Sequence, residues 1–389
     1  MKICMLDPLF YPYFGGAEKN VYEVSKRLAK KGHEIVVLTS QLPNTKREEE
    51  LDGIKIKRSA SVYLEKLPSF MPPPFTVAPF FVNDLRKEEA DVFHIHNRFW
   101  YYAGALLALK LKKAKTALTL HNAKPEGISF MTDKSAALYD GVWGHRIMEN
   151  MNGIIAVSEY TKRVTVPPQA QEKTVVIHNG VDVERFTPKK SGESVRAKLG
   201  VKDEFVVMTN ARLVEQKGLK YLIDAFAAFR KEKGFEHAKL LFVGKGPLKE
   251  KLIVHCESLG IKNEKDVFFR SGIPEEELPL YYRAADVFVL PSLWEPCAVV
   301  LFEALASGLP IITTAVGGTP EIMTRESGML VNAHSAEEIF DELKRFAFNA
   351  ELRAQFGKGA RERAVNAFTW EITAEKVEKF YESLLNPRE

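Results

Sequence analysis

Cysteine is scarce in this chain, and other features that would narrow its class are missing too. Three cysteines, Cys4, Cys256 and Cys297, occur in 389 residues, with no CxxC pair and no cysteine or histidine cluster at metal-ligand spacing. No apolar run approaches the roughly 20 residues of a membrane-spanning helix, and the first residues lack the pattern of a signal peptide. We therefore expect a soluble cytoplasmic protein with free thiols, which a peripheral contact would bring to the inner face of the membrane.

A large excess of one charge is also lacking. The chain has 55 Lys and Arg residues against 51 Asp and Glu residues, which gives a formal net charge of +4. The basic residues are spread among the acidic ones, and this argues against nucleic acid as a partner. The mild positive charge suits an anionic substrate or weak attraction to an acidic membrane surface.

Apolar residues, in contrast, are plentiful. They make up 46% of the chain, and 25 phenylalanines are among them, so a globular protein with a large core is expected. A chain of this length exceeds what one core usually organises, and we expect two domains. Short apolar runs rich in β-branched residues alternate with helical patterns throughout, which predicts the α/β class with parallel sheets.

A polar stretch, PKKSGES at 188–194, separates two series of strand candidates. We predict one Rossmann-like domain at 1–187, a second at 188–368, and a helix at 369–389 that returns to the first domain. The expected strands lie at 2–6, 35–39, 92–95, 116–120, 154–157, 175–178, 205–209, 239–243, 267–270, 287–290, 311–313 and 329–331.

One stretch does not follow this rhythm. In LPSFMPPPFTVAPFF, at 67–81, five prolines are mixed with aromatic residues. Proline excludes the stretch from a central strand or a helix interior. It is either a buried connection or an apolar lip for an acceptor or a membrane surface.

The segment SLWEPCAVVLFEALASGLP, at 292–310, directly follows a predicted strand. Pro296 can start a helix there, so the N–H groups of Cys297–Val299 would face the carboxyl end of the sheet, where anions and ligands bind. Glu303 lies in the otherwise apolar helix and would need hydrogen bonds, either from ribose hydroxyls or from a nearby arginine. Glu295 lies in the loop before it.

Two cations follow another strand, in NARLVEQKG at 210–218. Arg212 and Lys217 at a strand's carboxyl end could neutralise a diphosphate leaving group without a divalent metal. A lysine at the start of a helix can also be simply solvated.

Glycines and histidines occupy other strand ends. Gly15 and Gly16 lie between the first strand and the first helix, where backbone can approach a ligand closely, although the GxGxxG fingerprint is missing. Strand alternation places His94 and His96 on one side of a strand. Each histidine can be a satisfied core residue, but His121 ends its strand where ligand groups are expected.

Together these residues resemble a known family. Glu295 and Glu303 are separated by seven residues, which is similar to the EX7E motif of the retaining family four glycosyltransferases of the GT-B fold, the group that includes phosphatidylinositol mannosyltransferase. The GT-B fold has two Rossmann-like domains that face a central cleft. The resemblance implies that the domain at 1–187 binds the acceptor and the domain at 188–368 binds the nucleotide sugar. Further matching motifs are GGAE at 15–18, AVSEYTK at 156–162, NGVD at 179–182, RLVEQKG at 212–218, VGKGP at 243–247, VGGTPE at 316–321 and GMLV at 328–331.

The resemblance implies a role for each site residue. Glu303 would hold the donor ribose, Glu295 the hydroxyls of the donor sugar, and Arg212 and Lys217 the diphosphate. His121 would lie at the reacting face, and we expect His121, Arg212, Lys217 and Glu295 to be catalytic. The remaining donor contacts are expected at Gly15, Gly16, Gly244, Ile273, Cys297, Ala298 and Val299.

The motifs predict a hexosyltransferase that uses a UDP- or GDP-linked sugar and needs no metal or other cofactor. The acceptor can be lipid-linked, a sugar phosphate or a glycan, and the oligomeric state is left open. The alternatives are a nucleotide-sugar epimerase of similar fold and a noncatalytic nucleotide-sugar-binding protein. The chain departs from the family pattern at Ala298 and Asn210, where glycine is common.

Overall fold

The chain forms two compact units, which divide differently from the sequence-based domains. Unit 1 holds Met1–Pro125, Ser129–Gly180 and Trp370–Glu389, and unit 2 holds Val181–Thr369. The chain passes from unit 1 to unit 2 between Gly180 and Val181, before the predicted boundary at 187/188. The polar stretch at 188–194 therefore lies within unit 2. The computed structural model describes residues 1–13, 15–64, 75–77, 81–98, 105, 109, 110, 112, 114–123, 134 and 138–386.

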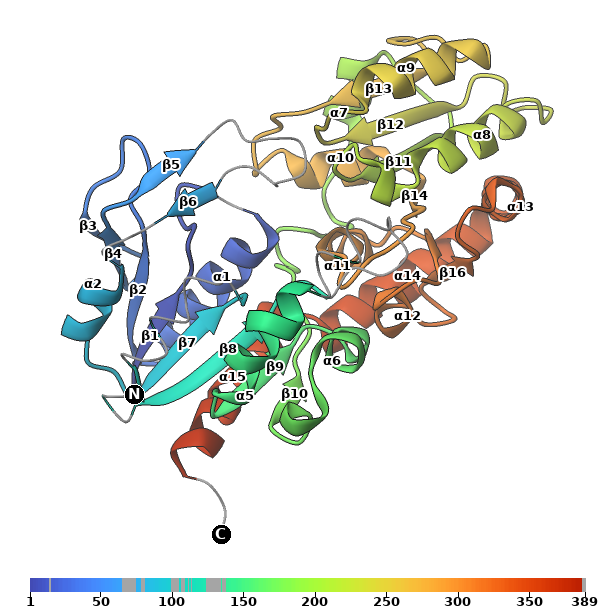
Figure 1. Cartoon of the computed structure of the whole chain (residues 1–389). Coiled ribbons are helices and arrows are strands. Elements are labelled where there is room, and N and C mark those ends of the chain that lie inside the picture. The colour runs from blue at the N-terminus through green and yellow to red at the C-terminus, as the bar shows by residue number, and fades with distance from the viewer. Residues whose placement is uncertain are drawn as a thin grey trace. The chain divides into compact units, whose positions relative to one another are not determined.

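Unit 1 is built on a sheet whose strands are parallel except for β3 at one edge (Figure 1). Its central strands match the predicted ones because they are short, apolar and buried. In spatial order the described strands are β10 (Thr174–Val176), β9 (Gly153–Ala156), β8 (Lys115–Leu120), β7 (Val92–His96), β1 (Lys2–Leu6), β2 (Glu34–Ser40), β4 (Ile54–Ser59) and β3 (Glu48–Leu51).

The sequence did not predict the strands near one edge. β3 reads EEEL and β4 reads IKIKRS, so charged residues obscure the apolar pattern. Within the proline-rich stretch 67–81, Phe75–Val77 forms β6, which pairs antiparallel with β5 (Val62–Leu64). β6 is not a central strand, because β5 and β6 make up a separate two-stranded sheet. Most of the stretch lies outside the described residues.

Alternation along the strands gives the sheet of unit 1 two apolar faces. Ile3 and Met5 belong to one buried cluster, whereas Cys4 and Leu6 belong to the other. The first face packs against α1 (Gly16–Lys30) and α15 (Trp370–Leu385). The other helices that the structure describes in unit 1 are α2 (Phe81–Lys87), the π-helical η1 (Asp140–Gly144), α5 (His145–Glu149), α6 (Glu159–Thr165) and the 3-10 helix η2 (Pro168–Ala170).

The C-terminal helix packs on unit 1, as predicted. Trp370 and Tyr381 of α15 are fully buried in the cluster that also contains strand residues of β1 and β2. Arg27 of α1 donates from Nε to Glu371 Oε1 at 2.7 Å, and Glu378 pairs with Lys31. The helix therefore completes one face of a sheet that begins at residue 2.

The sheet of unit 2 is parallel throughout, in an order that places a switch point at its centre. The order is β13 (Val267–Arg270), β12 (Lys239–Val243), β11 (Val206–Asn210), β14 (Val287–Leu290), β15 (Ile311–Thr314) and β16 (Gly328–Val331). The chain winds one way from β11 to β13 and the other way from β14 to β16. Ligands bind at such a reversal, outside the carboxyl ends of the strands.

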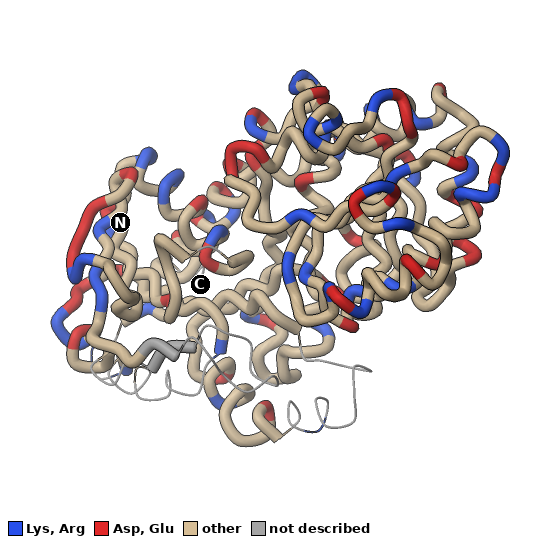
Figure 2. The backbone as a smooth tube through the Cα atoms, turned by 90° about the horizontal axis from the view of Figure 1, so that it is seen from above, with Lys and Arg blue, Asp and Glu red and all other residues tan. Residues whose placement is uncertain are grey.

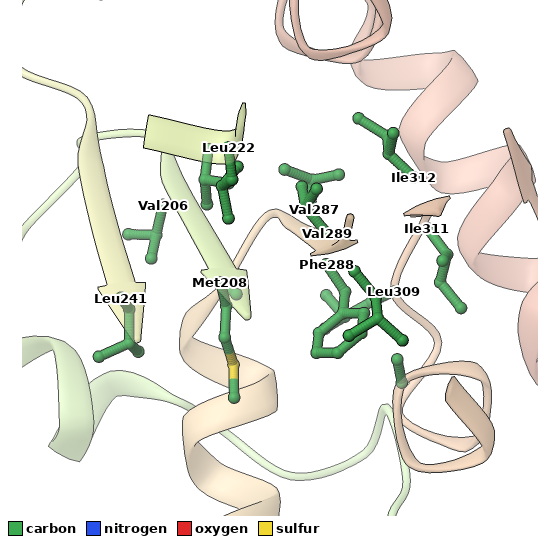
Figure 3. Close-up of a cluster of buried hydrophobic side chains, with 14 of the residues drawn as sticks. Val206, Met208, Leu222, Leu241, Val287, Phe288, Val289, Leu309, Ile311 and Ile312 are labelled. Carbon is green, nitrogen blue, oxygen red and sulfur yellow. The ribbon is translucent and has the colours of Figure 1, made fainter. Parts of the chain in front are cut away.

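One apolar core fills unit 2 (Figure 3). Side chains of β11, β12, β14 and β15, among them Met208, Leu241, Phe288 and Ile311, belong to this core together with Leu222 of α8. The helices of unit 2 are α7 (Glu193–Leu199), the 3-10 helix η3 (Glu215–Lys217), α8 (Leu219–Phe229), α9 (Lys249–Ser258), α10 (Leu278–Ala284), α11 (Val299–Ala306), α12 (Thr319–Ile322), α13 (Ala336–Phe348) and α14 (Ala350–Ala367).

The surface shows no segregation of charge by unit. Lys and Arg are interspersed with Asp and Glu along both units (Figure 2). Among the residues that the structure describes, no helix is both long and apolar enough to cross a membrane. Cys4 and Cys256 are buried free cysteines, as expected.

Candidate functional site

The structure brings most of the predicted donor-binding residues to one edge of the sheet of unit 2. Arg212 follows β11, Gly244 follows β12, Ile273 follows β13 and Glu295 follows β14. Because all these strands are parallel, the four residues lie at the same carboxyl edge. Arg212 and Glu295 flank the switch point between β11 and β14.

The two loops at the switch point are joined by hydrogen bonds. The Leu293 N–H donates to the Gln216 carbonyl at 2.8 Å, and Gln216 Nε2 donates to the Trp294 carbonyl at 2.9 Å. Gly218 has a φ of +59°, and a Cβ there would lie 2.2 Å from the Pro291 carbonyl oxygen. Only glycine lets the backbones approach this closely, so the two loops are held together.

An ion pair lies on these joined loops. The Lys217 ammonium contacts Glu295 Oε2, and the Ser292 hydroxyl donates to the same oxygen at 3.2 Å. The two charged side chains are 12% and 7% exposed. A buried pair of this kind is costly to break unless new partners replace the old ones. Arg212, by contrast, is exposed, and its guanidinium makes no hydrogen bond or ion pair with the described residues.

Gly244 is held close to the first of these loops. Its φ is +133°, and a Cβ would lie 2.1 Å from the Ala211 carbonyl oxygen. This close approach to the Ala211 backbone requires a glycine at position 244. Ala211 directly precedes Arg212, the predicted diphosphate contact. Ile273 is half-buried and packs against the core of unit 2.

The helix after β14 begins later than expected. Pro296 was predicted to start it, but α11 begins at Val299, with Ala298 as the N-cap residue. The residues before it form the loop that carries the ion pair with Lys217. In the first turn the Leu301 N–H donates to the Ala298 carbonyl at 3.0 Å, whereas the N–H groups of Val299 and Val300 precede the first intrahelical bonds. The predicted anion-binding end of the helix is therefore made by Val299 and Val300.

The departure from glycine at Ala298 causes no backbone strain. Its φ of −82° suits any L-residue, and the side chain is buried in the core cluster of unit 2. Cys297, just before it, is half-buried.

Glu303 lies inside α11, 5% exposed. Its Oε2 accepts a hydrogen bond from the Tyr282 hydroxyl at 2.8 Å. A tyrosine thus supplies one of the hydrogen bonds that sequence reasoning expected from ribose hydroxyls or an arginine. Burial, followed by the charge of Glu303, raises the pKa of Tyr282 well above its usual value.

Gly15, Gly16 and His121 belong to unit 1, whereas the other predicted site residues belong to unit 2. Gly15 caps α1, and its N–H donates to Glu18 Oε2 at 2.9 Å. This N–H is therefore already satisfied within the chain. Gly16 is the first residue of α1 and is exposed.

His121 directly follows β8 and is half-buried, in a cluster with His94 and His96, which are buried. His121 Nε2 and His96 Nδ1 are 2.9 Å apart, and the rings of His94 and His96 are 4.2 Å apart at their centroids. His94 contacts the Thr119 hydroxyl at 2.7 Å and the Tyr381 hydroxyl of α15 at 2.5 Å. The prediction that His94 and His96 share one side of a strand is consistent with this geometry.

Burial keeps this cluster uncharged. Burial lowers the pKa of His94 and of His121 to about 3. The pKa of His96 is also lowered, by burial and by its two histidine neighbours. His121 therefore offers a neutral imidazole, one nitrogen of which is bonded to His96.

Both halves of the chain match known families. The family model described as Glycosyltransferase Family 4 matches residues 14–185, and the one described as Glycosyl transferases group 1 matches residues 192–363. The chain belongs to the family 4 glycosyltransferases. This match favours a glycosyltransferase over the epimerase and the noncatalytic binding protein considered above.

The similarity of this glycosyltransferase to relatives and solved structures extends over almost the whole chain. The chain is 26% identical to the GDP-mannose-dependent alpha-(1-6)-phosphatidylinositol monomannoside mannosyltransferase of Mycobacterium tuberculosis, with 97% of each chain covered. Sucrose-phosphate synthase from Thermosynechococcus elongatus has a similar fold, with a TM-score of 0.79, 23% identity and full coverage of both chains. Anabaena HepE in complex with UDP gives 0.77 at 20% identity, with 98% of this chain and 100% of that chain covered. The GT-B fold is thereby confirmed.

Sequence reasoning missed two polar residues of this glycosyltransferase's site. Tyr282, in LPLYYRAAD, has the pattern of a core tyrosine on an amphipathic helix, and nothing local marks its contact with Glu303. Ser292 opens the loop that carries Glu295, and its position beside that glutamate was the available signal.

The histidine cluster predicts how stability depends on pH. The pKa of each histidine is lower in the folded than in the unfolded chain, so the unfolded chain binds more protons below a pH of about 6.5. The free energy of unfolding should then fall as pH falls below that value. In His94→Asn the slope between about pH 6 and 4 should be smaller by up to about 1.4 kcal/mol per pH unit, as measured by urea denaturation.

A matched control is His237→Asn, which alters an exposed histidine of unit 2. Its slope should equal that of the wild-type chain. Equal slopes for His94→Asn and the wild-type chain would show that His94 does not resist protonation in the fold.

Proposed function

We propose that this glycosyltransferase transfers a hexosyl group from a UDP- or GDP-linked sugar to an acceptor, with retention of the anomeric configuration. The observation that carries the proposal is the switch point of unit 2, where Arg212, Lys217 and the start of α11 bring positive charge to one sheet edge. A diphosphate is the anion that this arrangement fits. Among the similar proteins, Anabaena HepE forms a complex with UDP, and the mannosyltransferase of Mycobacterium tuberculosis is GDP-mannose-dependent.

Charge development on the leaving group gives these residues their role. Cleavage of the glycosidic bond leaves negative charge on the diphosphate, and fixed positive groups stabilise it. Arg212 and Lys217 supply two cations, and the N–H groups at the start of α11 supply a partial positive charge. These groups would do the work of a divalent metal, so the reaction is proposed to need none. The leaving phosphate would take the acceptor proton on the same face.

The ion pair between Lys217 and Glu295 implies an exchange of partners. Without donor, each charge compensates the other in a mostly buried place. A diphosphate would compete with Glu295 for Lys217, and the sugar hydroxyls would then occupy Glu295. Donor binding would thus replace one satisfied arrangement with another, which keeps the cost of rearrangement low.

The remaining residues are assigned by the same proposal. Glu303 would accept hydrogen bonds from the donor ribose, and the backbone at Ile273 would meet the base. In unit 1, His121 would bind near the sugar and the acceptor as a neutral hydrogen-bonding group. Gly16 would allow close approach to the donor.

We also propose that the acceptor is lipid-linked and that the chain contacts the membrane peripherally. Three large apolar side chains around η1 of unit 1, Leu138, Val142 and Trp143, are 70%, 42% and 43% exposed. Arg146 beside them is also exposed. An exposed tryptophan among apolar residues, with a cation nearby, suits the interface of an anionic membrane.

Incubation with labelled nucleotide sugars tests the activity. UDP- and GDP-linked hexoses are supplied with a lipid extract or with soluble sugar phosphates, with and without EDTA. We expect transfer from one donor, retention of configuration by NMR, and a rate that EDTA leaves unchanged. Formation of an epimer without acceptor would contradict the transferase, and loss of rate in EDTA would contradict metal independence alone.

The exchange of partners predicts that Glu295→Gln separates nucleotide binding from transfer. UDP or GDP, whichever the wild-type chain binds, should bind at least as tightly to the variant, because the carboxylate no longer competes for Lys217. Transfer should fall by about 100-fold or more, since a charged hydrogen bond to the sugar is lost in the transition state. Calorimetry and initial rates measure the two effects.

Glu215→Gln is the matched control, because it alters an exposed carboxylate of the joined loops. It should change neither quantity. If Glu295→Gln lost nucleotide affinity as strongly as transfer, Glu295 would act on the nucleotide and not on the sugar.

The membrane contact predicts that Trp143→Ser weakens binding to vesicles of phosphatidylcholine and phosphatidylglycerol by several-fold (about 1 kcal/mol or more). Co-sedimentation measures the bound fraction. Val254→Ser changes a residue of unit 2 that is 65% exposed and serves as control. Equal binding of the two variants and the wild-type chain would exclude this patch.

A further inference from the structure

Three polar side chains from three elements of unit 2 form a hydrogen-bonded series that ends on Glu303. Asn210 lies at the end of β11, Tyr282 on α10 and Glu303 on α11. Asn210 Nδ2 is 3.0 Å from the Tyr282 hydroxyl, and that hydroxyl is 2.8 Å from Glu303 Oε2. Tyr282 is fully buried and Glu303 is 5% exposed.

The chemistry of the three groups fixes the direction of both hydrogen bonds. A carboxylate only accepts, so the single hydroxyl hydrogen of Tyr282 goes to Glu303. The Val300 carbonyl, at 3.5 Å, is a more distant acceptor for that hydrogen. The tyrosine oxygen must then accept from Asn210, and only the amide nitrogen of that side chain can donate.

Aromatic packing holds the tyrosine hydroxyl in place. The ring of Phe186 meets that of Tyr282 edge to face at 5.6 Å, and the ring of Phe288 stacks on it at 5.6 Å. Because the ring of Tyr282 is fixed and its hydroxyl hydrogen is bonded to Glu303, the hydroxyl determines where the carboxylate of Glu303 lies. A carboxylate has about four acceptor sites, so it can accept from a ligand diol as well as from the tyrosine.

We infer that Asn210 and Tyr282 are positioning residues that orient Glu303 for the ribose diol of a nucleoside diphosphate. The inference rests on the proposed function, in which Glu303 meets the donor ribose. It also gives a role to the asparagine at 210, a position where the resembling family commonly has glycine. A glycine could not bond to Tyr282.

Ribose recognition distinguishes this role from simple support of the fold. If the series aims Glu303 at the ribose, its loss weakens binding of a ribonucleotide more than binding of a nucleotide that lacks a ribose hydroxyl. Loss of packing alone would weaken both nucleotides equally. The informative quantity is therefore the affinity for the ribonucleotide divided by the affinity for the nucleotide that lacks the ribose hydroxyl.

The experiment uses Tyr282→Phe and Asn210→Ala in the full chain. The probes are UDP and 2′-deoxy-UDP, or GDP and its 2′-deoxy form if the wild-type chain binds GDP, with affinities measured by calorimetry. For Tyr282→Phe we expect the ribonucleotide to bind about tenfold more weakly, as for loss of a hydrogen bond to a charged group. The deoxy form should be affected far less, the donor KM should rise, and kcat should stay within about twofold.

Tyr281→Phe, on the same helix, is the matched control because no hydrogen bond joins Tyr281 to Glu303 among the described residues. It should retain the wild-type ratio. Asn210→Ala should lower the ratio in the same direction as Tyr282→Phe, and circular dichroism checks that each variant is folded.

Several results would overturn the inference. An unchanged ratio in Tyr282→Phe, or an equal change in Tyr281→Phe, excludes positioning by Tyr282. Glu303→Ala separates this failure from failure of the proposed function. If Glu303→Ala keeps full nucleotide affinity, or if the wild-type chain binds neither UDP nor GDP, the assignment of Glu303 itself is wrong and the inference falls with it.

Discussion

The hydrogen bond from the Leu293 N–H to the Gln216 carbonyl joins the two loops on which the candidate donor site depends. It spans the point where strand order reverses, between β11 and β14. Gly218 permits the close approach of the two loop backbones, and the ion pair between Lys217 and Glu295 joins the same two loops. Each residue of the pair would be an isolated loop charge if the two strands were not neighbours.

Strand order also explains how far the sequence could predict this molecule. Central strands such as β12 and β14 are buried on both faces, so their apolar runs mark them clearly. β4 carries lysines at alternate positions near a sheet edge, so it lacks the continuous apolar run that marks the central strands. Site residues that follow central strands were predictable for the same reason, because parallel strands bring their carboxyl ends together.

The remaining parts of the site depend on contacts that no local pattern encodes. Pro296 is a good first residue for a helix, but the loop bonds around Trp294 and Glu295 delay α11 to Val299. Tyr282 is distant in sequence from both residues that it joins. The two sheet edges also differ in character: that of unit 2 holds buried charges, whereas that of unit 1 holds imidazoles kept neutral by burial.

The return of α15 to unit 1 governs the order in which the chain can finish folding. Unit 1 is synthesised first, yet Trp370 and Tyr381, which fill one face of its sheet, emerge from the ribosome last. Unit 2 ends at Thr369 and has all its residues before then. Since domains generally fold as they are made, the part of this apolar face that α15 covers, beside α1, must stay uncovered while unit 2 is completed. A nascent chain stalled before residue 370 would therefore carry a finished second unit and an unfinished first one.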